Sequence, residues 1–162
     1  MTLLATLPVA AVATTATAAP EPVAGSTIGG LTVGGLTYSD GAGTRTWGLR
    51  EHAAWSTRVI KPRYRVRTVH GYRASNSSDH GHRLAADFMV GPAKGDRVAK
   101  FSRKHHRQLN ISYVIWDQRI WSVERARDGW RLMADAGSAT ANHKDHVHVS
   151  YRRVPRDSTF RR

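Results

Sequence analysis

His146-Val147-His148-Val149-Ser150, near the carboxyl end of the chain, alternates polar and apolar residues with a period of two. This period is typical of a β-strand, in which residues two apart face the same side of the sheet. We therefore expect His146 and His148 to project together on one face, while Val147 and Val149 face a core.

Further strands are predicted upstream of it, where short apolar or alternating runs are bounded by turn residues. The run at 85–90 is closed by Gly91-Pro92, and a turn at Asp117-Gln118 separates two other runs. Asp128-Gly129 is another turn signal. The runs predicted as strands are residues 64–69, 85–90, 111–116 and 120–121.

Two helices are predicted between the strands. Apolar residues recur at roughly helical spacing from Leu49 to Ile60, and this helix should end before Pro62. Asp96 is a suitable N-cap for a second helix that continues to about Leu109. The sum is an α+β domain, with a small, mostly antiparallel sheet and flanking helices.

The organisation along the chain follows from changes in composition. Residues 1–19 form a signal-like apolar segment without a basic start, so the chain is expected to be secreted or in the cell envelope; alternatively the true start lies upstream. Residues 20–46 are rich in Gly and Thr and predict a flexible linker. Residues 47–152 form the expected domain, and 153–162 a basic tail. No membrane span is expected.

Composition restricts the chemistry. The chain of 162 residues has no Cys, which excludes disulfides and thiolate metal ligands and leaves any metal to histidines and carboxylates. Its 25 Lys and Arg against 12 Asp and Glu give a net charge of +13. This charge predicts attraction to a polyanion, for which nucleic acid, teichoic-acid-like wall polymers and anionic lipid headgroups all qualify. No heptad or long exposed apolar stripe indicates assembly, so a monomer is expected.

Two clusters of side chains predict a hydrolytic zinc site. His80 leaves a polar loop at residues 74–79, and Asp87 opens the next strand, so the seven residues of chain can present both to one ion. Together with one histidine of the final strand they provide two His and one Asp, and catalytic zinc usually takes three such ligands and one water. Asp145 is close enough to act as general base, and Arg73 or His146 could stabilise the developing oxyanion.

Three segments also carry a resemblance to the D-alanyl-D-alanine carboxypeptidase class of zinc peptidases, an M15-like group related to lysostaphin and hedgehog-type folds. It extends over about residues 47–152, and secreted actinobacterial members are the most similar. The segments are Gly71-Tyr72-Arg73, Ser78-Asp79-His80-Gly81-His82-Arg83-Leu84-Ala85-Ala86-Asp87 and Asp145-His146-Val147-His148.

The resemblance implies zinc on His80, Asp87 and His148. It also implies that Asp145 is the catalytic base, with Arg73, His146 and, in some members, His143 assisting. The implied substrates are the stem peptides of bacterial peptidoglycan.

One position departs from that class, because Arg83 stands where the class usually has Gly, four residues before the Asp ligand. Gly would permit a tight turn, so Arg83 predicts an altered loop or weakened activity.

The leading hypothesis is a zinc metallopeptidase that cleaves peptidoglycan peptides, held near anionic cell-wall polymers by its charge. An alternative is a non-catalytic wall or polyanion binding module on the same fold, with a structural metal or none. A nucleic-acid binder or metal nuclease is a third hypothesis, but the chain lacks an interleaved aromatic and basic motif, and no specific nucleic acid is expected as a partner.

Overall fold

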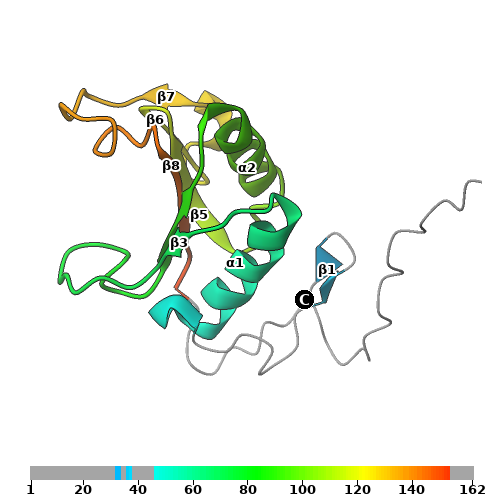
Figure 1. Cartoon of the computed structure of the whole chain (residues 1–162). Helices are drawn as coiled ribbons and strands as arrows, with labels where there is room; N and C mark the ends of the chain where they lie inside the picture. Colours follow the sequence, from blue (N-terminus) through cyan, green and yellow to red (C-terminus); the bar gives the residue numbers. More distant parts are fainter. Residues whose placement is uncertain (1–31, 34–35, 38–45, 154–162) are drawn as a thin grey trace, which may run out of the picture.

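The predicted final strand lies inside a six-stranded antiparallel sheet. The computed structural model describes residues 32–33, 36–37 and 46–153, and shows the sheet in the order β3-β4-β8-β5-β6-β7 (Figure 1). The strands are β3 (Val69–His70), β4 (Ala85–Met89), β5 (Ile111–Trp116), β6 (Arg119–Ser122), β7 (Arg131–Leu132) and β8 (His146–Tyr151). With two helices, α1 (Glu51–Arg63) and α2 (Pro92–Lys104), this confirms the α+β prediction.

Both helices pack on one face of the sheet, and within the described residues no helix lies against the other face (Figure 1). The alternation in β8 decides which residues meet the helices. Val147 and Val149 are fully buried in the apolar core, whereas His146 and His148 project from the opposite face. We call these the helix face and the open face of the sheet.

The core between the sheet and the helices is apolar and continuous. It contains Leu49 before α1, Phe88 of β4, Val98 of α2 and Val114 of β5, each fully buried. Burying such side chains contributes about 1.5–3 kcal/mol each, which makes the helix face the main source of stability.

The first helix and the strand after it differ from the prediction. α1 continues through Pro62 to Arg63, because a proline in the last turn removes only one helical hydrogen bond. The predicted strand at 64–69 is wrong except at its last residue. Arg65 takes a positive φ of 48°, and Val66 donates its N–H to the carbonyl of Lys61, so this segment closes the helix end instead.

The second helix also has different bounds. α2 begins at Pro92, whose fixed φ suits the first helical turn, and ends at Lys104, so the prediction of 96–109 with Asp96 as N-cap is wrong. Asp96 instead accepts a hydrogen bond from the indole of Trp116, at 2.9 Å. Gly95 permits this close packing, because a Cβ there would lie 2.1 Å from the Trp116 ring.

The hairpin of β5 and β6 is confirmed, with its turn at Asp117-Gln118. Both turn residues have positive φ, 47° and 59°, which is the pattern of the two-residue turns that match strand twist. The predicted strand at 85–90 is confirmed as β4. Gly129, with φ 67°, confirms the turn predicted after the short 3-10 helix Ala126–Asp128.

The terminal segments lie mostly outside the described residues. These are the signal-like segment 1–19, most of the linker 20–46 and the basic tail after Arg153. Within the linker range, β1 (Thr32–Val33) and β2 (Leu36–Thr37) pair in antiparallel fashion, and a 3-10 helix, Thr46–Gly48, begins at its last residue. In the part of the chain that is described, no helix has the length and apolar character needed to cross a bilayer.

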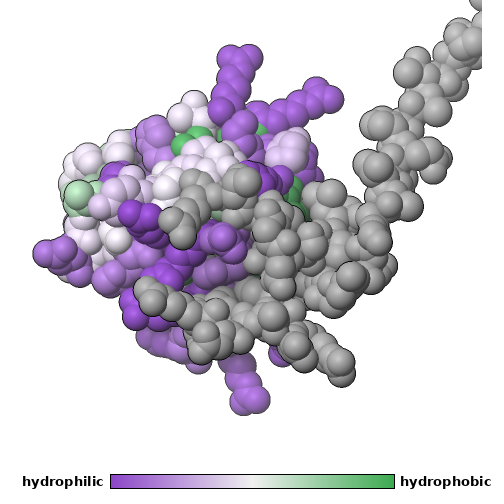
Figure 2. All heavy atoms as spheres, turned by 90° about the horizontal axis from the view of Figure 1, so that it is seen from below, coloured by the Kyte–Doolittle hydropathy of each residue, from purple (hydrophilic) through white to green (hydrophobic). Residues whose placement is uncertain are grey.

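The surface of the domain is strongly hydrophilic. In the view of Figure 2, hydrophilic residues cover most of the described face and hydrophobic ones form only small areas. Among the described residues, the large hydrophobic side chains that are exposed are Tyr72 and Leu132. The fold therefore presents charge and polarity outward, in line with the composition.

Candidate metal centre

The candidate site lies on the open face, where β4 and β8 run side by side. Asp87 and His148 are directly opposite each other in the register of these strands, so their side chains meet. His80 comes from the loop between β3 and β4. One ligand atom from each of His80, Asp87 and His148 lies within 4.8 Å of the others, and all three residues are buried. The structure therefore brings together the three ligands predicted from the sequence.

A tight turn directs His80 into this cluster. Arg83 donates its N–H to the carbonyl of His80, and Leu84 donates to the carbonyl of Asp79, which reverses the chain between the two ligands. Arg83 takes a positive φ of 63°, so the turn that glycine would favour forms with arginine in place. Gly81 is needed here, because a Cβ would lie 1.6 Å from the carbonyl oxygen of Ser75.

The hydrogen bonds of His80 favour a cation at the cluster. Its Nδ1 lies 2.6 Å from the carbonyl oxygen of Gly71, which can only accept, so Nδ1 carries a proton. In the neutral ring Nε2 is then a lone pair, yet it faces Oδ1 of Asp87 at 3.1 Å. Two acceptors at this distance need a proton or a metal ion between them. Donation from the second ring nitrogen to a carbonyl is also how metal-bound histidines are commonly oriented.

His148 completes the cluster from β8. Its Nδ1 lies 2.9 Å from Oδ1 of Asp87, and Tyr113 of β5 stacks on its ring with centroids 5.6 Å apart. Burial lowers the pKa of His148, although hydrogen bonding to Asp87 opposes the shift. A neutral imidazole is the form that binds metal.

Asp87 is the shared partner of the cluster. Burial by itself would raise the pKa of its carboxyl, but the polar contacts with His148 and His80 outweigh burial and hold the pKa well below its usual range. Its second oxygen accepts a 2.6 Å hydrogen bond from Arg73, whose side chain remains 56% exposed. The carboxylate therefore stays ionised, and Arg73 has part of its guanidinium free to meet solvent.

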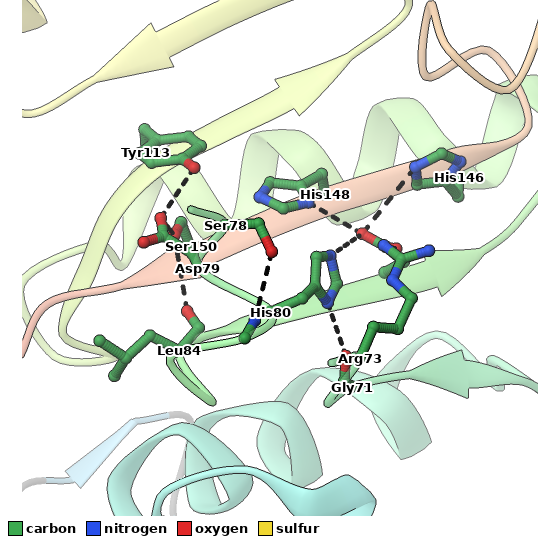
Figure 3. A network of polar contacts seen from close by, with 12 residues as sticks. Gly71, Arg73, Ser78, Asp79, His80, Leu84, Tyr113, His146, His148 and Ser150 are labelled. Carbon is green, nitrogen blue, oxygen red and sulfur yellow. Dashed lines mark hydrogen bonds and ion pairs between the residues drawn. The ribbon is translucent and has the colours of Figure 1, made fainter. Parts of the chain in front are cut away.

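Asp145 and His146 form a second layer beside the cluster. His146 Nδ1 lies 2.6 Å from Oδ1 of Asp145, and His146 Nε2 lies 3.8 Å from Oδ1 of Asp87. Asp145 also accepts a 2.6 Å hydrogen bond from Thr140, and the hydrogen bonds from Thr140 and His146 lower its pKa. His146 therefore faces the ligands, while Asp145 lies behind it. Figure 3 shows His80, His146, His148 and Arg73 gathered on the same side of the sheet.

His143 lies next to both histidines of β8. Its ring centroid is 4.8 Å from that of His146 and 5.7 Å from that of His148. Burial, followed by the nearby charges of His148 and His146, lowers its pKa to about 4. Its Nδ1 is buried and has no hydrogen-bond partner within the described residues. The structure thus gathers all seven predicted site residues on the open face.

A hydrogen-bond network that sequence reasoning missed supports the cluster from one side. Tyr113 donates to Oδ2 of Asp79 at 2.8 Å, and the hydroxyl of Ser150 donates to the same oxygen (Figure 3). Burial raises the pKa of Tyr113 to about 12, so its hydroxyl keeps its proton. Part of this network could have been predicted from the sequence, because Ser150 follows His148 by two residues and therefore shares its face of the strand.

A comparison with protein families assigns the chain to a family. The family model described as VldE, C-terminal domain, matches residues 45–144, which is more than half of the chain. The chain belongs to the VldE C-terminal domain family. A curated relative, an uncharacterized secreted protein of Arthroderma benhamiae, is 44% identical over 55 residues. That match covers 32% of this chain and 22% of the relative, well under two thirds of its length. No solved structure matches the chain.

This family corrects the resemblance drawn from the sequence. The assignment to the M15-like D-alanyl-D-alanine carboxypeptidase class is wrong, since the matching family is VldE C-terminal domain. The assignment rested on three short motifs. Such motifs indicate which side chains could bind a metal, but they are weak evidence of common descent. A set of two His and one Asp can recur on unrelated chains, because zinc imposes the same requirements on each.

Proposed function

We propose that this chain is a zinc-dependent hydrolase whose metal ligands are His80, Asp87 and His148. One observation carries the proposal: His80 Nε2, on a ring whose Nδ1 is held by the carbonyl of Gly71, faces the Asp87 carboxyl group at 3.1 Å in a buried site. Such an arrangement is costly without a cation and favourable with one.

The donor set favours zinc over other divalent cations. Two imidazoles and one carboxylate match the ligands of catalytic zinc, whereas magnesium and calcium prefer oxygen ligands alone. The chain has no Cys, so no thiolate can compete. Zinc, when bound, lowers the pKa of its water to about 7 and makes it a nucleophile near neutral pH.

The residues beside the ligands suit proton transfer. His146 Nε2 lies 3.8 Å from Oδ1 of Asp87, and Asp145 accepts a hydrogen bond from His146 Nδ1. In the proposed mechanism His146 takes a proton from the attacking water through Nε2 and returns it to the leaving group, while Asp145 stabilises the resulting imidazolium. In this proposal the base is therefore His146, and Asp145, which the sequence predicted as the base, acts through it.

Arg73 suggests the class of substrate. Its guanidinium is 56% exposed beside the cluster and touches Asp87 through one nitrogen. An arginine in this place can hold a carboxylate through its planar fork. We therefore propose a peptide amide near a free carboxylate as the scissile bond, and stem peptides of peptidoglycan as candidate substrates. The partial relative is named a secreted protein, and export of this chain is proposed with its apolar segment 1–19.

The experiment compares zinc-loaded wild type with His146→Ala and Asp145→Asn on a synthetic stem pentapeptide ending in D-Ala-D-Ala, with products measured by mass spectrometry. Both variants should keep their zinc and hydrolyse the peptide about 10²–10⁴ times more slowly. Asp128→Asn is the matched control, since Asp128 is exposed and pairs with Arg125 away from the site. A zinc-loaded wild type that cleaves no peptide would reject the hydrolytic proposal.

A second candidate is a non-catalytic module in which the same zinc is structural. The burial of all three ligands favours it, because structural zinc sites are closed and catalytic ones keep a position open. In that case the zinc-loaded chain should gain stability but cleave no peptide, and His146→Ala should behave like the wild type in both measurements.

A further inference from the structure

A cavity that is separate from the three candidate ligands lies beside α2. It has a volume of about 510 Å³ and is formed by the outer side of α2, the turn between β5 and β6, and Trp130 before β7. Trp116 of β5 belongs to the core on the helix face, whereas Tyr113 of the same strand stacks on His148 on the open face. The cavity therefore belongs to the opposite side of the sheet from the metal centre and shares no residue with it.

Four cationic side chains line this cavity. Lys100, Arg103 and Lys104 come from consecutive turns of α2, and Arg119 comes from the start of β6. All four are exposed, and none forms an ion pair with another residue in the described part of the chain. Four cations directed at one cavity favour an anionic group, which arginine can hold through two parallel hydrogen bonds.

Two tryptophans provide an apolar surface in the same cavity. Trp116 is only 7% exposed, and its indole is held in place by Asp96 and by its close packing on Gly95. Trp130 is half-buried and packs against the core from the loop before β7. A fixed aromatic surface of this kind stacks on the flat apolar side of a ring in a ligand.

The cavity also contains acceptors for hydroxyl groups. Asp96 and Asp117 both line it, and Asp96 uses one oxygen for the indole of Trp116, which leaves its other oxygen for a ligand. Carboxylates accept hydrogen bonds from hydroxyls and repel other anions. A ligand that fits must therefore combine an acidic group with a ring that carries hydroxyls, and a volume of about 510 Å³ is within the range of small-molecule sites.

We propose that this cavity binds an acidic sugar unit, with its phosphate or carboxylate on Arg119 and the α2 cations and its ring against Trp130. Such units are the building blocks of anionic polysaccharides and sugar-phosphate polymers. The cavity would then anchor the chain to a polymer, independently of what the metal centre does.

The test is a titration of the isotope-labelled full chain by NMR, following the indole N–H signals. The probes are glucose 6-phosphate, glucuronic acid, glucose, inorganic phosphate and adenosine monophosphate. An acidic sugar should shift the signals of Trp116 and Trp130 but not those of Trp47 and Trp55, and should bind about tenfold more tightly than glucose or inorganic phosphate. The better of the two acidic sugars identifies the acidic group.

Variants show whether the cavity is responsible. Arg119→Gln, at an exposed position that the core does not need, should weaken binding about tenfold, and Trp130→Ala should do the same if it folds. Arg127→Gln removes an equal charge from the exposed 3-10 helix outside the cavity and should change binding less than about twofold. His80→Ala should leave binding unchanged.

Several results would overturn the proposal. If Arg119→Gln and Arg127→Gln weakened binding of the acidic sugar equally, the sugar would be attracted to positive charge in general and not to this cavity. Inorganic phosphate binding as tightly as the sugar phosphate would remove the role of the ring. Tighter binding of adenosine monophosphate would assign the cavity to nucleotides, and no shift with any probe would show that it binds none of these.

Discussion

The two faces of the sheet are built from the same strands but stabilised in different ways. Along β8, Val147 and Val149 enter an apolar core covered by both helices, whereas His146 and His148 meet Asp87 on a face without a helix. Both sets are buried. Alternation with a period of two therefore places a core and a candidate metal centre back to back in one strand.

The difference between the faces is energetic. The helix face gains free energy from apolar burial, in any solvent that keeps the chain folded. The open face buries a carboxylate, several imidazoles and an arginine contact, and such groups stabilise the fold only when each finds a partner. We therefore expect the stability of the helix face to respond to loss of side-chain volume and that of the open face to respond to zinc.

The largest effect should come from the helix face. Phe88 is fully buried, so Phe88→Ala should lower the free energy of unfolding by about 3–5 kcal/mol, with or without zinc. The neighbouring Met89 lies on the open face and is partly exposed, so Met89→Ala should cost much less. Urea denaturation of both variants measures the difference, and equal losses would contradict the division between the faces.

The open face should show its dependence on zinc. At a zinc concentration about 100 times its dissociation constant, the free energy of unfolding of the wild type should rise by about 2.7 kcal/mol. Asp87→Asn keeps the shape of the side chain but removes the charge that His80 and His148 face, so its stability should not respond to zinc. Thermal denaturation with zinc and with a chelator tests this. A zinc response that survives in Asp87→Asn would place the ion elsewhere.

A pH dependence should arise on the helix side. His52 in α1 is buried and lies 2.9 Å from the carbonyl oxygen of Arg152, and burial lowers its pKa below 6.5. As the pH falls, His52 is therefore protonated in the unfolded chain before it is protonated in the folded chain. The free energy of unfolding is unaffected by His52 above pH 6.5 and decreases as the pH drops below it. His52→Gln can still donate to Arg152 and should reduce the loss of stability between pH 7 and 5. An unchanged slope would contradict the role of His52.

The smallest effect concerns the turn that brings His80 to Asp87. Arg83 has φ 63°, and its guanidinium lies 4.9 Å from the centre of the Tyr72 ring. Arg83→Gly and Arg83→Ala both lose that contact, but only glycine tolerates the backbone conformation without strain. The glycine variant should therefore be more stable than the alanine variant by about 1 kcal/mol in thermal denaturation. Equal stability would show that the turn changes its conformation on substitution.

Sequence reasoning succeeded where a local pattern has one physical interpretation. The alternation of 146–150 and the turn at Asp117-Gln118 predicted β8 and the β5–β6 hairpin, because period and turn chemistry are local. The grouping of His80, Asp87 and His148 was also predicted, since a chain without Cys leaves histidines and carboxylates as the candidate metal donors. His80 and Asp87 lie only seven residues apart, so one tight turn was sufficient to join them.

It failed where contacts distant in the sequence decide the outcome. Tyr64 to Thr68 alternate like a strand, but a positive φ at Arg65 and hydrogen bonds back to α1 prevent pairing. Asp96 has the chemistry of an N-cap, yet Trp116 engages it, and the helix begins one turn earlier. The position of Asp145 behind His146 depends on Thr140, which no motif spacing indicated.

The central claim is that His80, Asp87 and His148 hold zinc, and its most direct test is the zinc content of the purified chain by elemental analysis. Wild type and His82→Ala, a matched variant of an exposed histidine in the same loop, should each carry about one zinc per chain, and His148→Ala should carry none. A wild type without zinc, or a His148→Ala variant that retains as much as the wild type, would contradict the account.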